Sequence, residues 1–299
     1  MLEKNIFIVA AGLFILGCQP EKIATQEAAV AENAAIVSRR AVENQILVSG
    51  GTFVMGDFGT VDDEGKWHAY FPRTADIELA HEVTLSDYSL ARYETTLFDF
   101  DTFLLATGRP VVFSVQGRDI PRQPYNESVD DWRYLTHPAL VTWQQAKDYC
   151  AWLAEETGLG FDLPSSAQWE FAARNRGSKE WVHPTPDGKP FDGTNAFLES
   201  SIGPVGSRLP PNPLGLYDMA DNAEEWVNDW YSETYYGESD GATDPAGPAE
   251  GEGRVLRSLG GGPWSFSFSH RIGKEGLSDG PPPIAGFRCA IDEPEGEAS

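Results

Sequence analysis

Cysteine, histidine and basic residues are all scarce in this chain. It contains three cysteines, five histidines and 22 Lys and Arg residues against 46 Asp and Glu residues, so its formal net charge is −24 at pH 7. A surface of this charge repels phosphate backbones, which argues against nucleic acid as a partner. The charge favours divalent cations or basic partners, although it is equally typical of a protein that only has to stay soluble.

The few histidines form no recognisable metal site. They are His68, His81, His137, His183 and His270, and none of the spacings between them is typical of metal ligands. A phosphate-binding loop is also missing. The histidine with the most reactive surroundings is His270, because Arg271 follows it directly. Such a pair could bind an anionic group or move a proton, and the alternative is a salt bridge at the surface.

The first 18 residues have the pattern of a bacterial lipoprotein. An apolar run at residues 5–17 is too short to span a bilayer comfortably, and it ends in Ile-Leu-Gly directly before Cys18. We therefore predict a signal peptide at residues 1–17 and a lipid on Cys18 that attaches the chain to a bacterial membrane. Gln19 follows the cysteine, which favours the outer membrane, with the chain facing the periplasm. The alternative is an ordinary signal peptide that happens to contain a cysteine.

The remaining chain divides into three parts. Residues 18–44 are polar and rich in alanine and read as a tether, residues 45–291 form one domain, and residues 292–299 are an acidic tail. If Cys18 carries lipid, Cys150 and Cys289 are left as one possible disulfide of an oxidising compartment. The alternative is two separate buried thiols.

Helix signals are few and clear. Apolar periodicity predicts helices at residues 94–107, 142–157 and 165–174. Thr142 can cap the second helix and Gly158 can end it, while Ser165 and Gln168 have the spacing of a capping box for the third. Between the helices lie short strands and long loops with 30 Gly and 21 Pro. The pattern predicts an α+β domain with little regular structure, which needs a metal ion or a disulfide to fix its loops.

Eight separate stretches give the chain a family resemblance. They lie at residues 50–56, 81–85, 93–96, 138–143, 146–153, 163–174, 212–219 and 225–231, and the end at 286–290 also fits. In this order they resemble the formylglycine-generating enzyme, or sulfatase-modifying factor, family from about residue 46 to 291. The resemblance implies an elaborated C-type-lectin-like α+β fold. It also implies a disulfide between Cys150 and Cys289, which the family has at these positions.

The resemblance further implies a structural calcium ion. By position, its ligands would be the side chains of Asp218 and Glu225 and the backbone carbonyls of Asp221 and Ala223. Calcium prefers such hard oxygen ligands. Asp221 departs from the family, which usually has glycine there. The alternative is that these acidic residues form a solvated turn.

The resemblance fails at the family's catalytic segment. Enzymes of the family bind Cu(I) through two cysteines shortly after an Arg-Gly-Gly-Ser-Trp-like stretch, because this soft ion needs thiolates. Here Phe266 and Arg271 stand at the two cysteine positions. We therefore expect neither copper nor copper-thiolate oxidation.

Two functions fit this sequence. The similarity is strongest to a periplasmic branch of the family that lacks the cysteine pair and takes part in pyoverdine maturation, which implies an oxidoreductase-like role with His270 and Arg271 as candidate catalytic residues. The alternative is a non-catalytic binding or structural lipoprotein of the envelope, such as the gliding-motility members of the family. The sequence does not identify a small-molecule or protein substrate, since a fold alone does not define function.

Overall fold

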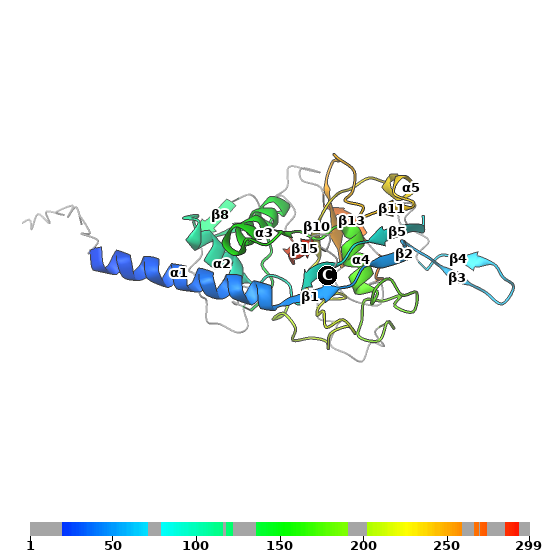
Figure 1. Ribbon diagram of the computed structural model, residues 1–299, viewed down its shortest axis with the longest axis horizontal. Helices are drawn as coiled ribbons and strands as arrows, with labels where there is room; N and C mark the ends of the chain where they lie inside the picture. Colours follow the sequence, from blue (N-terminus) through cyan, green and yellow to red (C-terminus); the bar gives the residue numbers. More distant parts are fainter. Residues whose placement is uncertain are drawn as a thin grey trace, which may run out of the picture.

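The structure is a computed structural model that describes residues 20–70, 79–115, 118–121, 136–190, 202–258, 266–268, 270–273 and 285–292. Short helices and several small sheets are mixed along the chain, so the predicted α+β class is confirmed (Figure 1). The elements are α1 (Pro20–Glu43), β1 (Gln45–Val48), β2 (Gly51–Met55), β3 (Thr60–Val61), β4 (Trp67–His68), β5 (His81–Leu85), β6 (Tyr88–Ala91), α2 (Leu97–Ala106), β7 (Val112–Val115), β8 (Arg118–Pro121), α3 (Trp143–Thr157), β9 (Phe161–Asp162), α4 (Ser166–Ala173), β10 (Glu225–Trp230), α5 (Tyr235–Glu238), β11 (Ala242–Thr243), β12 (Arg254–Arg257), β13 (His270–Gly273), β14 (Gly286–Phe287) and β15 (Ala290–Asp292).

Three small sheets organise the body. Their strand orders are β1-β6-β15-β9, β13-β12-β10-β14 and β11-β5-β2. Strand β15 lies between β6 and β9, and β14 lies beside β10. The end of the chain therefore pairs with strands from much earlier in the sequence. In particular, β14 runs parallel to β10 with Gly286 opposite Glu225. This pairing decides which side chains meet at the candidate site.

The helix ends follow the sequence signals. The hydroxyl of Thr142 accepts a hydrogen bond from the backbone N–H of Gln145 at 3.3 Å, and the Gln145 side chain accepts one from the N–H of Thr142 at 3.0 Å. Gly158 ends the same helix with φ of 72°, a left-handed conformation that glycine adopts without strain. Ser165 and Gln168 form the corresponding capping box of α4. The predicted starts of these two helices are therefore confirmed.

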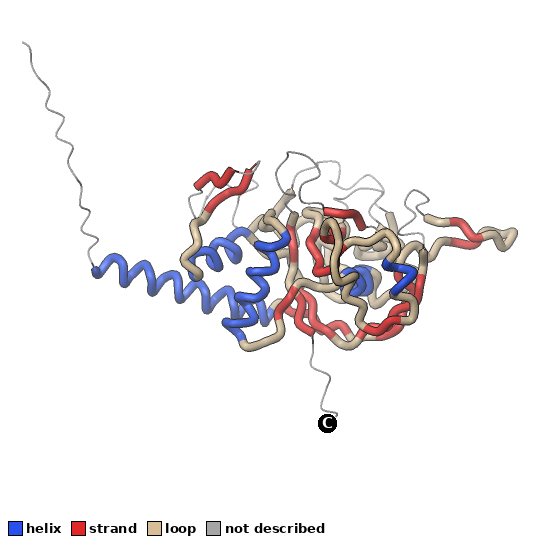
Figure 2. Tube along the Cα trace, turned by 90° about the horizontal axis from the view of Figure 1, so that it is seen from above, coloured by secondary structure: helices blue, strands red, loops and turns tan. Residues whose placement is uncertain are grey.

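Helix α1 forms nearly all of the segment at residues 18–44 that the sequence predicts to be a tether. Its first turns project from the body, whereas its last turns pack on α2 and α3 (Figures 1 and 2). Ala34 and Val37 are buried there, and Arg40 forms an ion pair with Asp99. The contact uses small side chains spaced along one helix face, which composition alone does not distinguish from a solvated linker. No helix in the described ranges is long and apolar enough to cross a membrane.

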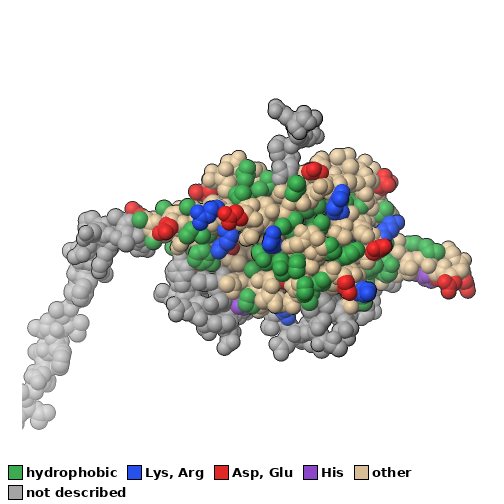
Figure 3. All heavy atoms as spheres, turned by 60° about the horizontal axis from the view of Figure 1, so that its bottom comes forward, with side chains coloured by type: hydrophobic (Ala, Val, Ile, Leu, Met, Phe, Trp, Pro, Cys, Tyr) green, Lys and Arg blue, Asp and Glu red, His purple; other side chains and the backbone are tan. Residues whose placement is uncertain are grey.

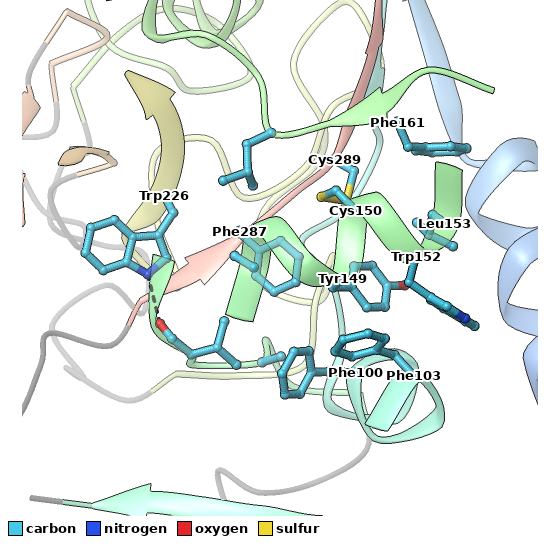
Figure 4. Packing of buried hydrophobic residues seen from close by; sticks show 14 of the residues in the cluster. Phe100, Phe103, Tyr149, Cys150, Trp152, Leu153, Phe161, Trp226, Phe287 and Cys289 are labelled. Atoms are coloured by element: carbon cyan, nitrogen blue, oxygen red, sulfur yellow. Dashed lines mark hydrogen bonds between the residues drawn. A yellow bond between two sulfur atoms is a disulfide. The ribbon is translucent and has the colours of Figure 1, made fainter. Parts of the chain in front are cut away.

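An aromatic core surrounds the disulfide. Cys150 and Cys289 are bonded to each other and almost fully buried, which confirms the predicted pair. The bond joins α3 to the segment before β15 across 139 residues of sequence. Figure 4 shows the rings that pack around it, which include Phe100, Phe103, Tyr149, Trp152 and Phe287. Closing so long a loop stabilises the fold by about 4–5 kcal/mol if the effect is entropic.

A buried charge network ties α4 to the sheets. The carboxylate of Glu170 lies 3.0 Å from Nη1 of Arg174 and 3.1 Å from Nη1 of Arg257, and all three side chains are fully buried. Glu170 also accepts the backbone N–H of Gly56 at 2.9 Å. We call Glu170, Arg174 and Arg257 the Glu170 network. Because every charge in it has a partner of opposite sign, it is a structural element of the core.

Candidate functional site

The loop before β10 holds the residues that the sequence assigns to calcium. Asp218 and Asn222 have φ of 60° and 69°, and Asp and Asn tolerate this left-handed conformation better than most residues. The two left-handed positions turn the loop inward, so Asp218, Asp221 and Glu225 are all buried. Oδ2 of Asp218 accepts the backbone N–H of Gly206 at 2.6 Å. The predicted acidic residues therefore line the interior of the loop.

Glu225 is held by an arginine from the end of the chain. Nη2 and Nε of Arg288 lie 2.6 and 2.8 Å from the two carboxylate oxygens, and the indole N–H of Trp169 donates to one of them at 3.0 Å. All three side chains are fully buried or nearly so. The parallel pairing of β10 with β14 produces this contact, because it places the segment around Arg288 beside Glu225. Both carboxylate oxygens of Glu225 thus already have partners.

A fourth carboxylate, Glu94, completes the group and was missed by the sequence interpretation. It precedes α2 and accepts the backbone N–H of Ala223 at 3.0 Å and the side-chain amide of Asn222. We call Glu94, Asp218, Asp221 and Glu225 the acidic cluster. Helix periodicity gave no reason to place Glu94 here, since the contact depends on residues about 130 positions later in the chain.

The acidic cluster is short of positive charge. Arg288 neutralises Glu225, and Nε of Arg208 lies 3.0 Å from Oδ2 of Asp221. Burial raises the pKa of Asp218 to about 6, and the neighbouring Asp221 and Glu225 add to this while Arg288 opposes it. Burial likewise raises the pKa of Glu94 well above its usual range, with Asp218 and Glu225 contributing. Four carboxylates thus share two guanidinium groups, and the raised pKa values of Glu94 and Asp218 favour their protonated forms.

One carboxylate oxygen of the acidic cluster, Oδ1 of Asp218, could bind a cation. Oδ1 of Asp218 is buried and has no hydrogen-bond partner among the described residues. A buried carboxylate oxygen without a partner is costly, and a hard cation would satisfy it. Across the described ranges, however, no three Asp, Glu, His or Cys side chains converge as a metal-binding group. The residues therefore fit a cation held by Asp218 with backbone carbonyls, while both oxygens of Glu225 are already bonded to Arg288.

The two positions of the missing cysteine pair lie in different surroundings. Phe266 is 9% exposed and stacks on Phe268 at 5.2 Å and on His183 at 4.9 Å between ring centroids. The backbones of His270 and Arg271 lie in β13, opposite Arg257 and Leu256 of β12. Their side chains lie outside the described part, as does Cys18. The first cysteine position is thus filled by a packed aromatic ring.

Comparison with known proteins gives a consistent result. A family model described as "Sulfatase-modifying factor enzyme 1-like domain" matches residues 30–293. The formylglycine-generating enzyme of Streptomyces coelicolor is 31% identical over 315 residues, which cover 90% of this chain and 96% of the relative. The serine/threonine-protein kinase Pkn1 of Chlamydia trachomatis serovar L2 is 32% identical over 86% of this chain, but the match spans only 40% of that longer protein.

Among solved structures, PvdO from Pseudomonas aeruginosa is similar. The two share 26% identity with a TM-score of 0.61, and the match covers 83% of this chain and 94% of PvdO. The match to the family model starts at residue 30, within α1. The second half of α1 therefore lies in the same matched region as the core on which it packs.

Proposed function

Because this chain belongs to the family of sulfatase-modifying factor enzyme 1-like domains, we propose that it is a copper-free member of that family that works in the bacterial envelope. The observation that carries this proposal is the packing of Phe266. Copper(I) in proteins needs soft sulfur ligands, and both remaining cysteines, Cys150 and Cys289, are bonded to each other. The buried side chain of Phe266, which stacks on Phe268 and His183, offers no ligand atom for a copper ion.

The envelope location rests on the lipoprotein pattern at Cys18. Helix α1 starts at Pro20, two residues after this cysteine, and its far end packs on α2 and α3. If Cys18 carries a lipid, α1 connects the membrane directly to the body of the domain. A helix holds the domain in a more defined orientation than a flexible tether does.

The likeness to PvdO supports a maturation role in the periplasm. In this role the protein is oxidoreductase-like but does not use copper-thiolate chemistry. His270 and Arg271, whose backbones lie in the edge strand β13 of the sheet β13-β12-β10-β14, remain its candidate catalytic residues. A second candidate is a non-catalytic binding or structural protein of the envelope. The closed aromatic packing at Phe266 favours it, since this packing leaves the family's reaction position filled.

Calcium would have a structural role in either case. The residues that fit it are Asp218 by its unpartnered oxygen and Asp221 and Ala223 by their backbone carbonyls. Glu225 would then act from outside the ligand set, through its ion pair with Arg288. A bound cation would neutralise the excess charge of the acidic cluster and fix the loop before β10.

Copper content and product analysis test the proposal. The purified chain is incubated with Cu(I) and a cysteine peptide that the Streptomyces coelicolor formylglycine-generating enzyme oxidises, and that enzyme serves as the positive control. We expect no stoichiometric copper by mass spectrometry and no formylglycine product. One copper per chain or any formylglycine above background would overturn the copper-free proposal.

A second experiment separates maturation from binding. Culture extracts of the parent bacterium are compared with those of strains that carry a deletion of the gene or the His270→Ala variant. Maturation by oxidation would remove two hydrogen atoms from the precursor and pass their electrons to an external acceptor such as dioxygen. It predicts that both strains accumulate the same precursor, heavier than the product by two hydrogen atoms. Accumulation in the deletion strain alone would remove His270 from the proposed chemistry. Unchanged extracts in both strains would favour the binding role.

A further inference from the structure

The hairpin formed by β3 and β4 projects from the body at the end opposite α1 (Figures 1 and 2). Every residue from 60 to 68 is exposed. Two of them are large and apolar, since Val61 is 61% exposed and Trp67 is 47% exposed. This hairpin shares no residue with the acidic cluster, so its role is a separate question.

The base of the hairpin is anchored in the core. Asp57 is fully buried, and its Oδ1 accepts the backbone N–H groups of Gly59 at 2.9 Å and Tyr70 at 3.2 Å. These two residues lie on the two arms of the hairpin, so one carboxylate holds both arms. Phe58 packs edge-on against Tyr70 and Phe268, with ring centroids 5.5 and 6.0 Å apart. The hairpin therefore rises from the aromatic packing that contains Phe266.

The turn of the hairpin is ordered as well. The Asp62 carboxylate accepts the backbone N–H groups of Glu64 at 3.0 Å and Lys66 at 2.8 Å, and its other oxygen lies 2.7 Å from Nε2 of His68. A two-stranded hairpin alone is marginally stable in water. The hydrogen bonds of Asp57 at its base and of Asp62 at its turn compensate for this low stability and give the projecting segment a defined shape.

Trp67 is fixed although it is half exposed. Its indole N–H donates to the carbonyl of Phe58 at 3.1 Å. The indole lies against Gly59, where a Cβ atom would come within 2.3 Å of the ring. Trp67 pairs across the hairpin with Val61, so the two side chains share one face. Such a pair stabilises a hairpin, yet here Val61 and Trp67 remain 61% and 47% exposed.

We propose that the face formed by Val61 and Trp67 binds a protein partner through an apolar pocket with a rim of Lys and Arg side chains. A rigid, exposed tryptophan has the properties of an interface hot spot, because little conformational entropy remains to be lost on binding. Beside it the turn carries Asp62, Asp63 and Glu64 against the single cation Lys66. Figure 3 shows apolar side chains along the arm and acidic ones at its tip.

The position of the hairpin favours a protein over the anchoring membrane. Helix α1, which leads from the predicted lipid on Cys18, leaves the body at the opposite end (Figure 1). The acidic turn would also be repelled by an anionic lipid surface. A basic protein rim, by contrast, would gain from the negative charge through faster and more specific association.

Photocrosslinking in the parent bacterium tests the proposal with the full-length chain. p-Benzoylphenylalanine is placed at position 61, and at position 159 as a control, since Leu159 is 41% exposed at another site. We expect one protein adduct from position 61, none from position 159, and loss of the adduct when Trp67→Ala is combined with the probe. With the crosslinked protein identified and purified, Trp67→Ala should weaken its affinity by about tenfold or more, as is typical of hot spots.

Two further variants keep the test decisive. Asp63→Lys with Glu64→Lys reverses the charge of the turn without removing any side-chain hydrogen bond present in the described residues, and it should weaken binding by a similar factor. Trp67→Phe should retain most of the affinity. An unchanged affinity in Trp67→Ala, or no adduct from position 61, would overturn the proposal. A blue shift of tryptophan fluorescence with phosphatidylcholine vesicles that Trp67→Phe abolishes would replace it with membrane insertion.

Discussion

The Glu170 network and the acidic cluster both bury carboxylates, but they balance charge in different ways. In the Glu170 network one carboxylate contacts two guanidinium groups, with N to O distances of 3.0 and 3.1 Å. In the acidic cluster four carboxylates share Arg288 and Arg208, and Oδ1 of Asp218 has no partner in the described residues. The first arrangement is complete within the protein, whereas the second needs a proton or a cation from outside.

This difference separates a structural element from a candidate binding site. In the Glu170 network both carboxylate oxygens lie within ion-pair distance of a guanidinium group, so the network specifies how its elements pack and does not need an added cation. A buried carboxylate with an unsatisfied oxygen responds to its surroundings, because a proton or a metal ion changes its free energy. The predictions below begin with the arrangement whose disruption should have the largest effect.

The largest effect is expected from Glu170→Gln. This change removes the carboxylate that pairs with both buried arginines and leaves Arg174 without its ion-pair partner, so the free energy of unfolding should fall by about 3–5 kcal/mol, measured by urea unfolding. The control is Asp148→Asn, because Asp148 pairs with Arg109 where the two side chains are 30% and 44% exposed. That change should cost less than about 1 kcal/mol. Equal losses in both variants would show that the Glu170 network does not determine core stability.

Helices α3 and α4 could be predicted because their signals are local. Thr142 with Gln145 and Ser165 with Gln168 each form a capping box within four residues, and no distant contact is needed to explain them. The disulfide was predictable from the family resemblance. The docking of α1 was not, because the residues that it buries are as small as those of a linker.

The candidate site was predictable only in part. The acidic residues at 218, 221 and 225 stand close together in the sequence, so their common location follows from spacing. Glu94 joins them through hydrogen bonds to Asn222 and Ala223, and Arg288 through the pairing of β14 with β10, so both contacts join residues more than 60 positions apart. As a result the sequence assigned Glu225 to calcium, whereas the structure pairs it with Arg288. Contacts of this kind depend on tertiary topology.

Calcium should produce the next largest effect, on the acidic cluster alone. If Asp218 holds a calcium ion, a calcium concentration about 100 times the Kd should stabilise the protein by about 2.7 kcal/mol relative to chelator. The Asp218→Asn variant should lose this response, because its amide is a poorer ligand and carries no charge. Asp63→Asn, at an exposed position, should keep it. Thermal melts with calcium or chelator give the measurement, and a response that survives Asp218→Asn would place any calcium elsewhere.

The smallest effect is expected from Asp229, a carboxylate that is buried beside the Glu170 network. It accepts the backbone N–H of Ser166 at 2.7 Å, and burial raises its pKa to about 6 although Arg257 and Arg254 oppose this. Between about pH 4 and 6 the folded state therefore binds more protons than the unfolded state, so this group lowers stability as pH rises through that range.

Asp229→Asn should remove this pH dependence. The raised pKa corresponds to at most about 3 kcal/mol at pH 7, and because the new amide must find partners in the same space we expect a gain of about 1 kcal/mol. At pH 4 the two proteins should differ little, since the wild-type carboxyl is then protonated in the folded state. Urea unfolding at pH 4, 5, 6 and 7 gives the comparison. The opposite result would be a variant whose stability relative to wild type falls between pH 4 and pH 7. It would show that Arg257 and Arg254 favour the charged form of Asp229 more than burial disfavours it.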